Sequence, residues 1–209
     1  MLLVMALIRF NSSGPIIYRQ QRVGYKRKLF MIFKFRTMHL NVDTRTHEEY
    51  FANLMRSDRP MTKLDTAGDT RVFRGGRFLR VTGLDELPQI FNVLRGDMSL
   101  VGPRPCLPNE FEQYESSEQL RVNAPPGLTG YWQVNGKNHT TFKEMIAMDM
   151  FYIANMSPWL DLKIISRTIP VLFGQAKTSI SSRLHKQAKS AVPFMTPARV
   201  EKNGSTHRL

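Results

Sequence analysis

The residues best suited to chemistry are two adjacent carboxylates, Asp85 and Glu86. Arginines stand on both sides of the pair, including Arg80 before it and Arg104 after it. Carboxylates can hold a divalent cation or attack phosphorus, and the arginine fork matches phosphate oxygens in a bidentate way. Together these side chains indicate phosphoryl transfer. The alternative interpretation of the arginines is a solvated basic face without chemistry.

A helix is expected to position the carboxylate pair. Apolar residues recur there at helical spacing, at Leu84, Leu87, Phe91 and Leu94. Pro88 is tolerated only in the first turn of a helix, so Asp85 is predicted at or just before the helix N-terminus. There the free amides and the helix dipole stabilise a carboxylate and attract phosphate. A simple Asp N-cap explains the same residue without any chemistry.

The elements around this segment indicate an α+β fold in which helices dominate. Two apolar runs, residues 16–23 and 29–38, flank GYKRK and predict a β-hairpin. Prolines stiffen two loops, GPRP at residues 102–105 and PPGLTG at residues 125–130. Helices are predicted around residues 48–55, over 142–155 and from 160 towards 173. Beyond Gln175 the composition predicts a mobile basic tail.

The net charge restricts the partners of the chain. Lys and Arg total 30 against 17 for Asp and Glu, which gives a net charge of +13. Such a balance suits polyanionic partners, whether nucleic acid, an anionic bilayer or a diphosphate substrate. A basic nucleic-acid-binding module is therefore an alternative function. The sequence contains no recognised nucleic-acid-binding motif, so no nucleic-acid partner is expected.

Cysteine content and hydropathy restrict the compartment. The single cysteine, Cys106, excludes an internal disulfide and a cysteine-based zinc site, so the chain fits a reducing compartment. The opening MLLVMALI lacks the features of a signal peptide and is shorter than the roughly 20 apolar residues of a transmembrane helix. We expect these residues to be buried in the fold or to dip into a membrane interface.

Several motifs in one order resemble the bacterial sugar transferase family, the monotopic phosphoglycosyl transferases. The string LDELPQIFNVLRGDMSLVGPRP is similar to the signature of that family. GPIIYRQQRVG followed by FKFRTM resembles the N-terminal hairpin of the family, PGLTGYWQVNGK a later loop, and MDMFYIANMSPWLDLKII the terminal helices. The resemblance covers roughly residues 11–172, which is far more specific than one short motif.

The resemblance implies a two-step transfer of a sugar-1-phosphate from a UDP-sugar to polyprenyl (undecaprenyl) phosphate. Asp85 would be the nucleophile that forms an aspartyl phosphosugar, and Glu86 would help to bind Mg²⁺. Arg80 and Arg104 would offset the charge of the diphosphate. The implied place is the anionic cytoplasmic face of the bacterial inner membrane, as the first membrane step of polysaccharide or glycoconjugate synthesis.

Three further polar residues are weaker candidates. Asp149 fits the family pattern but falls on the apolar face of its expected helix, where a carboxylate needs a cation. That cation is either Mg²⁺ or a structural partner such as Arg104. Gln133 and Asn135, in WQVNG, would hold the nucleotide or sugar, or else satisfy the backbone of their loop.

The sequence departs from the family pattern at two places. The family normally opens with a longer apolar segment that enters the membrane, so residues 1–10 are interpreted as its remnant. Residues 11–175 are the expected catalytic domain, and residues 176–209 the tail. Gly83 stands where the family usually has Ser, which removes a cap or phosphate donor. A catalytically weak member that acts as a non-enzymatic partner is therefore another alternative.

Overall fold

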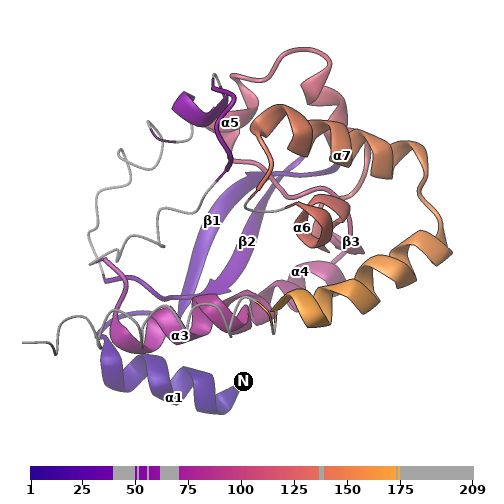
Figure 1. The fold of residues 1–209 in the computed structure, drawn as a ribbon. Coiled ribbons are helices and arrows are strands. Elements are labelled where there is room, and N and C mark those ends of the chain that lie inside the picture. The colour runs from indigo at the N-terminus through magenta and orange to yellow at the C-terminus, as the bar shows by residue number, and fades with distance from the viewer. Residues whose placement is uncertain are drawn as a thin grey trace, which may run out of the picture.

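A computed structural model describes residues 1–39, 50, 52–55, 57–61, 71–136, 139–172 and 174. Its architecture is the expected α+β fold dominated by helices. A long β-hairpin runs through the middle of the molecule (Figure 1). Helices α1 and α3 lie at one end of the hairpin and α5 and α7 at the other. The predicted basic tail, residues 176–209, lies outside the described residues.

The predicted hairpin is confirmed. Strands β1 (Ile17–Val23) and β2 (Leu29–Phe35) pair antiparallel, with Ile17 opposite Phe35 and Val23 opposite Leu29. The turn contains a short 3₁₀ helix, η1 (Tyr25–Arg27). Directly opposed residues of an antiparallel pair share one face of the sheet, and the faces alternate along each strand. We name the even face by its members: Tyr18, Gln20, Arg22, Phe30, Ile32 and Lys34.

The open edge of β2 is covered by a side chain. Helix α3 (Arg74–Thr82) is followed by the 3₁₀ helix η3 (Leu84–Gln89) and by α4 (Ile90–Leu94). From α4, the fully buried Asn92 accepts a hydrogen bond from the amide of Phe33 at 3.1 Å. Its Nδ2 donates to the carbonyl of Met31 at 2.7 Å. Asn92 thus replaces a neighbouring strand, and it fixes η3 and α4 against β2.

Most apolar residues of the helical stripe face outward. Leu87, Phe91 and Leu94 are 41%, 50% and 77% exposed, whereas Gln89 and Asn92 are buried. The segment is also two short helices rather than one, because the chain changes from 3₁₀ to α geometry at Ile90. The reason is the pairing of Asn92 with the strand edge, which turns the polar side of the segment inward. The apolar side then faces outward.

The departure at Gly83 has a conformational explanation. Gly83 ends α3 in the left-handed region, with φ 72°, and η3 begins directly after it. Residues with a Cβ are disfavoured at such a φ, and glycine is not. A Cβ at Gly83 would also lie 3.1 Å from Leu172. The glycine therefore allows the sharp junction that precedes Asp85.

The second half of the chain surrounds a short parallel pair of strands, β3 (Ser99–Val101) and β4 (Gly127–Thr129). Two proline-containing loops follow β3 and precede β4. They approach so closely that a Cβ on Gly102 would lie 2.2 Å from the carbonyl oxygen of Pro125. The connecting elements are α5 (Pro108–Phe111), η4 (Glu118–Asn123) and α6 (Tyr131–Asn135).

The predicted C-terminal helices are confirmed. Helix α7 (Phe142–Ala154) begins with a capping box between Thr141 and Glu144, and a further helix covers residues 158–172. Residues 50 and 52–55 are helical, within the range predicted around residues 48–55.

The apolar opening of the chain forms α1 (Leu2–Asn11). Ile8 is completely buried with Phe35 and Leu79, whereas Leu3 is 87% exposed. The expected burial therefore holds for one side of the helix, and insertion of the exposed side into a membrane interface stays a prediction. Along the part of the chain that is described, no helix is long and apolar enough to cross a bilayer.

Removal of the Asn92 side chain tests whether it closes the sheet edge. Asn92→Ala leaves the partly buried amide of Phe33 and the carbonyl of Met31 without a partner. We expect a loss of about 2–4 kcal/mol in the free energy of unfolding, measured by urea denaturation. The exposed Asn123→Ala is the control and should change stability by less than about 0.5 kcal/mol. Equal effects of the two substitutions would show that the edge contact contributes nothing.

Candidate active site

Asp85 and Glu86 lie in the first turn of η3, and both are partly buried. Gly83, not Asp85, occupies the N-cap position of this helix, and the amide of Glu86 donates to its carbonyl at 3.1 Å. A capping role therefore does not account for Asp85. The predicted position near a helix N-terminus is correct, although the helix is of the 3₁₀ type.

A cation from the hairpin contacts this pair. Lys34, on the even face of β2, donates from Nζ to Oε1 of Glu86 at 2.9 Å. The two side chains are 20% and 32% exposed, so the contact is partly shielded from water. Sequence reasoning missed Lys34. The available signal was one cation inside the otherwise apolar run LFMIFKF.

Arg80 approaches the same end of β2 from α3. Its Nη1 donates to Oγ1 of Thr37 at 3.3 Å, and Thr37 follows the last residue of β2 by two positions. Helix α3 also packs directly on η3. The structure therefore gathers Arg80, Lys34 and the carboxylate pair around the end of β2. This is a mixed-charge site that can bind an anion next to a carboxylate.

Arg104 lies at the opposite end of the even face. It belongs to the loop after β3, and its side chain is exposed. Arg22 of the even face donates to the carbonyl of Pro105 in that loop at 3.1 Å. Arg22 is four residues from Tyr18, the residue opposite Lys34, which corresponds to about 13 Å along a strand. An extended ligand on this face could contact both ends.

Asp149 is buried and pairs with Arg121 of η4, with Oδ2 2.5 Å from Nη2. The predicted need for a cation is correct, but the suggested partner Arg104 is wrong. Arg104 contributes only its backbone carbonyl, which accepts from Arg121 at 3.0 Å. Burial raises the pKa of Asp149 and by itself would lower that of Arg121. Their contact holds the pKa of Arg121 above its ordinary value and opposes the rise in the pKa of Asp149.

The two remaining candidates lie on α6. Asn135 is exposed, donates to the carbonyl of Tyr131 at 2.8 Å and accepts from Arg167 at 3.0 Å. These contacts match the interpretation of Asn135 as a residue that satisfies its own helix end. Gln133 differs, because its buried Oε1 has no hydrogen-bond partner among the described residues. Its assignment to a ligand stays a prediction.

The acidic pair is the best candidate for a metal site. Within the described ranges, no group of three or more His, Cys, Asp or Glu side chains lies close enough to hold an ion. Mg²⁺ often takes only one or two carboxylates from the protein and completes its shell with phosphate oxygens and water. Asp85 and Glu86 fit that requirement, whereas Asp149 lies on α7 with its carboxylate against Arg121.

The structural and metal-binding interpretations of Asp149 can be separated by stability in the presence of a chelator. Asp149→Asn leaves the buried Arg121 without its counter-charge, so we expect a loss of about 3–5 kcal/mol in the free energy of unfolding. The measurement is urea denaturation with excess EDTA for the parent and the variant. Equal stability in EDTA, combined with lost metal affinity, would instead make Asp149 a metal ligand.

Comparisons with known proteins point to one family. The family model described as bacterial sugar transferase matches residues 1–175. The exopolysaccharide production protein ExoY of Sinorhizobium fredii is 40% identical over 171 residues, which cover 82% of this chain and 76% of that protein. The undecaprenyl-phosphate galactose phosphotransferase of Salmonella typhimurium is 41% identical, over 78% of this chain and 34% of that protein.

A third relative comes from Caulobacter vibrioides. Its UDP-glucose:undecaprenyl-phosphate glucose-1-phosphate transferase is 42% identical over 180 residues, which cover 82% of this chain and 62% of that protein. The chain thus spans most of the length of ExoY but only about a third of the Salmonella relative. Since the family model extends over most of the sequence, the chain belongs to the bacterial sugar transferase family.

Proposed function

We propose that this chain transfers a sugar-1-phosphate from a UDP-sugar to polyprenyl (undecaprenyl) phosphate, through an aspartyl phosphosugar on Asp85. The observation that carries the proposal is the carboxylate pair at the start of η3, with Lys34 and Arg80 at the same end of β2. The names of the Salmonella and Caulobacter relatives support the substrate class. The sequence and site leave the sugar open.

The first step is displacement at the β-phosphorus. A carboxylate oxygen of Asp85 forms a bond to phosphorus, the bond to the bridging oxygen breaks, and UMP leaves with that electron pair. An aspartate with an ordinary pKa near 3.9 is ionised at neutral pH and needs no general base. The difficulty is repulsion between two anions. Lys34 and Arg80 reduce that repulsion by placing positive charge beside the phosphates.

The second step regenerates the protein. A phosphate oxygen of the polyprenyl phosphate attacks the same phosphorus, and the bond to Asp85 breaks, which returns the free carboxylate. The product is a polyprenyl diphosphate sugar. In the first step the even face of the hairpin would lie beneath the nucleotide. Arg104 at its far end would contact the nucleotide portion of the substrate, while the reacting phosphorus lies near η3.

Mg²⁺ is the proposed cofactor, with Glu86 as the protein ligand. When bound, the ion offsets the charge of the diphosphate. Glu86 fits this role because it is adjacent to Asp85 and partly exposed. Its contact with Lys34 provides a counter-charge until metal and substrate arrive. The assignment of Asp149 to the metal receives no support from its contact with Arg121.

Loss of the nucleophile is the direct test of this function. Asp85→Asn should reduce the release of UMP from a UDP-sugar by about three orders of magnitude or more, even without acceptor. A panel of UDP-sugars with nucleotide detection is the assay. Asp58→Asn, which removes an 86% exposed carboxylate, is the matched control and should retain parental activity.

Two outcomes would reject the proposed mechanism. Substantial UMP release by the Asp85→Asn variant would exclude Asp85 as nucleophile. A parent protein that releases no UMP with any sugar, in membranes containing polyprenyl phosphate, would favour the catalytically weak alternative. Salt-sensitive binding of random DNA by that inactive protein would favour the nucleic-acid-binding alternative.

We further propose that the protein attaches peripherally to an anionic bilayer, at the cytoplasmic face of the inner membrane. Exposed apolar side chains gather on α1, α4 and the helix over residues 158–172: Leu2, Leu3, Phe10, Leu94, Trp159, Leu162 and Ile169. In Figure 1, α1 and the helix over residues 158–172 lie along the same lower side of the molecule. Exposed Arg9, Arg95, Lys163 and Arg167 accompany them. Apolar insertion flanked by basic residues suits an anionic leaflet.

Liposome sedimentation across a salt series tests this attachment. We expect binding to anionic vesicles that falls strongly with salt, because each basic residue near the surface contributes about 1 kcal/mol and salt screens it. Leu94→Ser should weaken binding. Leu120→Ser, which removes an exposed leucine from η4, should not. Equal binding to neutral vesicles at all salt concentrations would contradict the electrostatic part of the proposal.

A further inference from the structure

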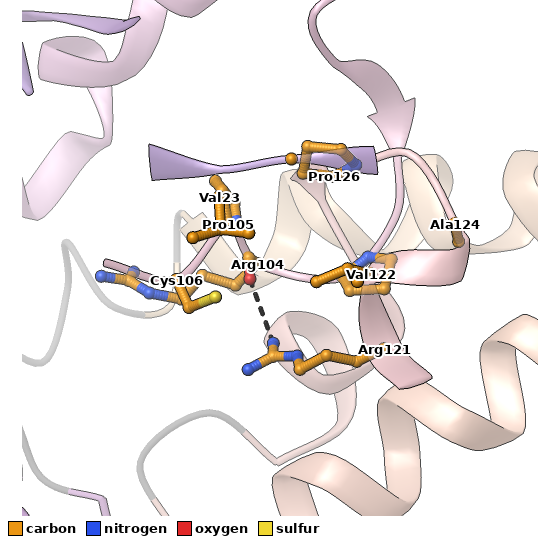
Figure 2. A pocket seen from close by; sticks show the side chains of 10 residues that line it. Val23, Arg104, Pro105, Cys106, Arg121, Val122, Ala124 and Pro126 are labelled. Carbon is orange, nitrogen blue, oxygen red and sulfur yellow. Dashed lines mark hydrogen bonds between the residues drawn. The ribbon is translucent and has the colours of Figure 1, made fainter. Parts of the chain in front are cut away.

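Two buried arginines contact consecutive carbonyl groups of the GPRP loop from behind. Nη2 of Arg121 donates to the carbonyl of Arg104 at 3.0 Å, which Figure 2 marks with a dashed line. Nη1 of Arg22 donates to the carbonyl of the next residue, Pro105, at 3.1 Å. The donors come from two distant elements, β1 and η4. The loop is therefore held at two adjacent points by side chains that are 99 residues apart in the sequence.

Both arginines are built into the interior. Arg22 is 7% and Arg121 is 3% exposed. Arg121 also donates to the hydroxyl of Tyr114 at 3.0 Å and pairs with Asp149, so its guanidinium is held from three directions. Arg22 has only Gln20 as its other hydrogen-bond partner within the described residues, at 2.7 Å. Burial of a cation with so few hydrogen-bond partners costs free energy. We therefore infer that the contact of Arg22 with the loop has a function.

The loop itself is well suited to present one side chain. Pro103 and Pro105 fix their own φ angles and lack amide hydrogens, so the loop has few ways to satisfy its own backbone. Arg104 between them is exposed, and its guanidinium has no hydrogen bond or ion pair among the described residues. Burial and the nearby charge of Arg104 lower the pKa of Arg22 to about 10. Arg121 is paired with Asp149, whereas Arg22 and Arg104 have no acidic side chain in direct contact among the described residues.

The space behind the loop is too small for a substrate. The cavity lined by Arg104, Cys106, Arg121 and Pro126 has room for roughly one water molecule (Figure 2). Cys106 follows the loop directly, is 3% exposed, and is the only cysteine of the chain. Ligand contact must therefore occur on the outer side, where the Arg104 side chain lies.

We propose that Arg22 and Arg121 are positioning residues, which hold the GPRP loop by its two carbonyls so that Arg104 faces the nucleotide portion of the UDP-sugar. The proposal takes the identity of the ligand from the proposed function. The contacts that hold the loop do not depend on that function. Neither arginine touches substrate. Their contribution passes through the backbone of residues 104 and 105 to the side chain of Arg104.

The first arm of the test measures the loop without any activity. Alkylation of Cys106 by iodoacetamide in the native protein requires the loop to open, since the thiol is buried. Arg22→Lys and Arg121→Lys keep the charge but lose the fork, and each should increase the alkylation rate by about tenfold. Arg36→Lys is the matched control. Arg36 is 5% exposed and contacts the carbonyls of Ser12 and Ser13, so its substitution should leave the rate unchanged.

The second arm is a double-mutant cycle on kcat/KM for the UDP-sugar. If the two arginines act through Arg104, then Arg121→Lys and Arg22→Lys should lower kcat/KM in the parent but hardly further in an Arg104→Ala background. Arg36→Lys should have the same fractional effect in both backgrounds. A purely structural role would give additive losses for all three substitutions.

The outcomes separate the positioning proposal from the proposed function. Unchanged alkylation in both lysine variants, or additive losses in the cycle, would overturn the positioning role. An inactive parent would reject the proposed function, and fast alkylation in the variants would still support the held loop. If Arg121→Lys fails to fold, Tyr114→Phe removes one contact of Arg121 and should produce a smaller change in the same direction.

Discussion

The pairing of Asn92 with the free edge of β2 is the contact on which the arrangement of the candidate site depends. A two-stranded sheet has unsatisfied amides and carbonyls on its outer edges, and burial makes them costly. The side-chain amide of Asn92 donates to Met31 and accepts from Phe33 as a neighbouring strand would. This contact presses η3 against the hairpin. Glu86 then meets Lys34, and Asp85 takes its place in the same turn.

The same contact has a second consequence at the surface. Because the polar side of α4 faces the strand, its apolar side chains face outward, and Leu94 becomes one of the most exposed leucines. Exposed apolar side chains do not stabilise a protein that is surrounded only by water. A protein that acts on a lipid phosphate, in contrast, needs apolar side chains beside its site to contact the bilayer. One buried amide thus links the position of the carboxylates to the proposed contact with the bilayer. The far end of the hairpin depends on different contacts, those of Arg22 and Arg121 with the GPRP loop.

The sequence predicted those features that depend on local patterns. The hairpin followed from two apolar runs around a polar turn, and α7 from its apolar spacing. The carboxylate pair and the flanking arginines could be identified as site candidates because they lie close together in the sequence and both residue types take part in phosphoryl transfer. Partners distant in sequence could not be predicted this way. Lys34 is 52 residues from Glu86, and Arg121 is 28 residues from Asp149. The periodicity within one strand or helix does not specify which other element packs against it. The apolar spacing along residues 84–94 likewise did not specify which side of α4 is buried, since the edge contact of Asn92 decides it.

The most direct measurement of the central claim is the mass of the peptide that contains Asp85 after reaction with a UDP-sugar in the absence of lipid acceptor. Cleavage after Arg80 and Arg95 releases residues 81–95, which include Asp85 and Glu86. The account predicts that this peptide gains the mass of one sugar phosphate, that fragmentation places it on Asp85, and that polyprenyl phosphate removes it. Release of UMP with this peptide unmodified, or a sugar phosphate on another residue, would contradict the account.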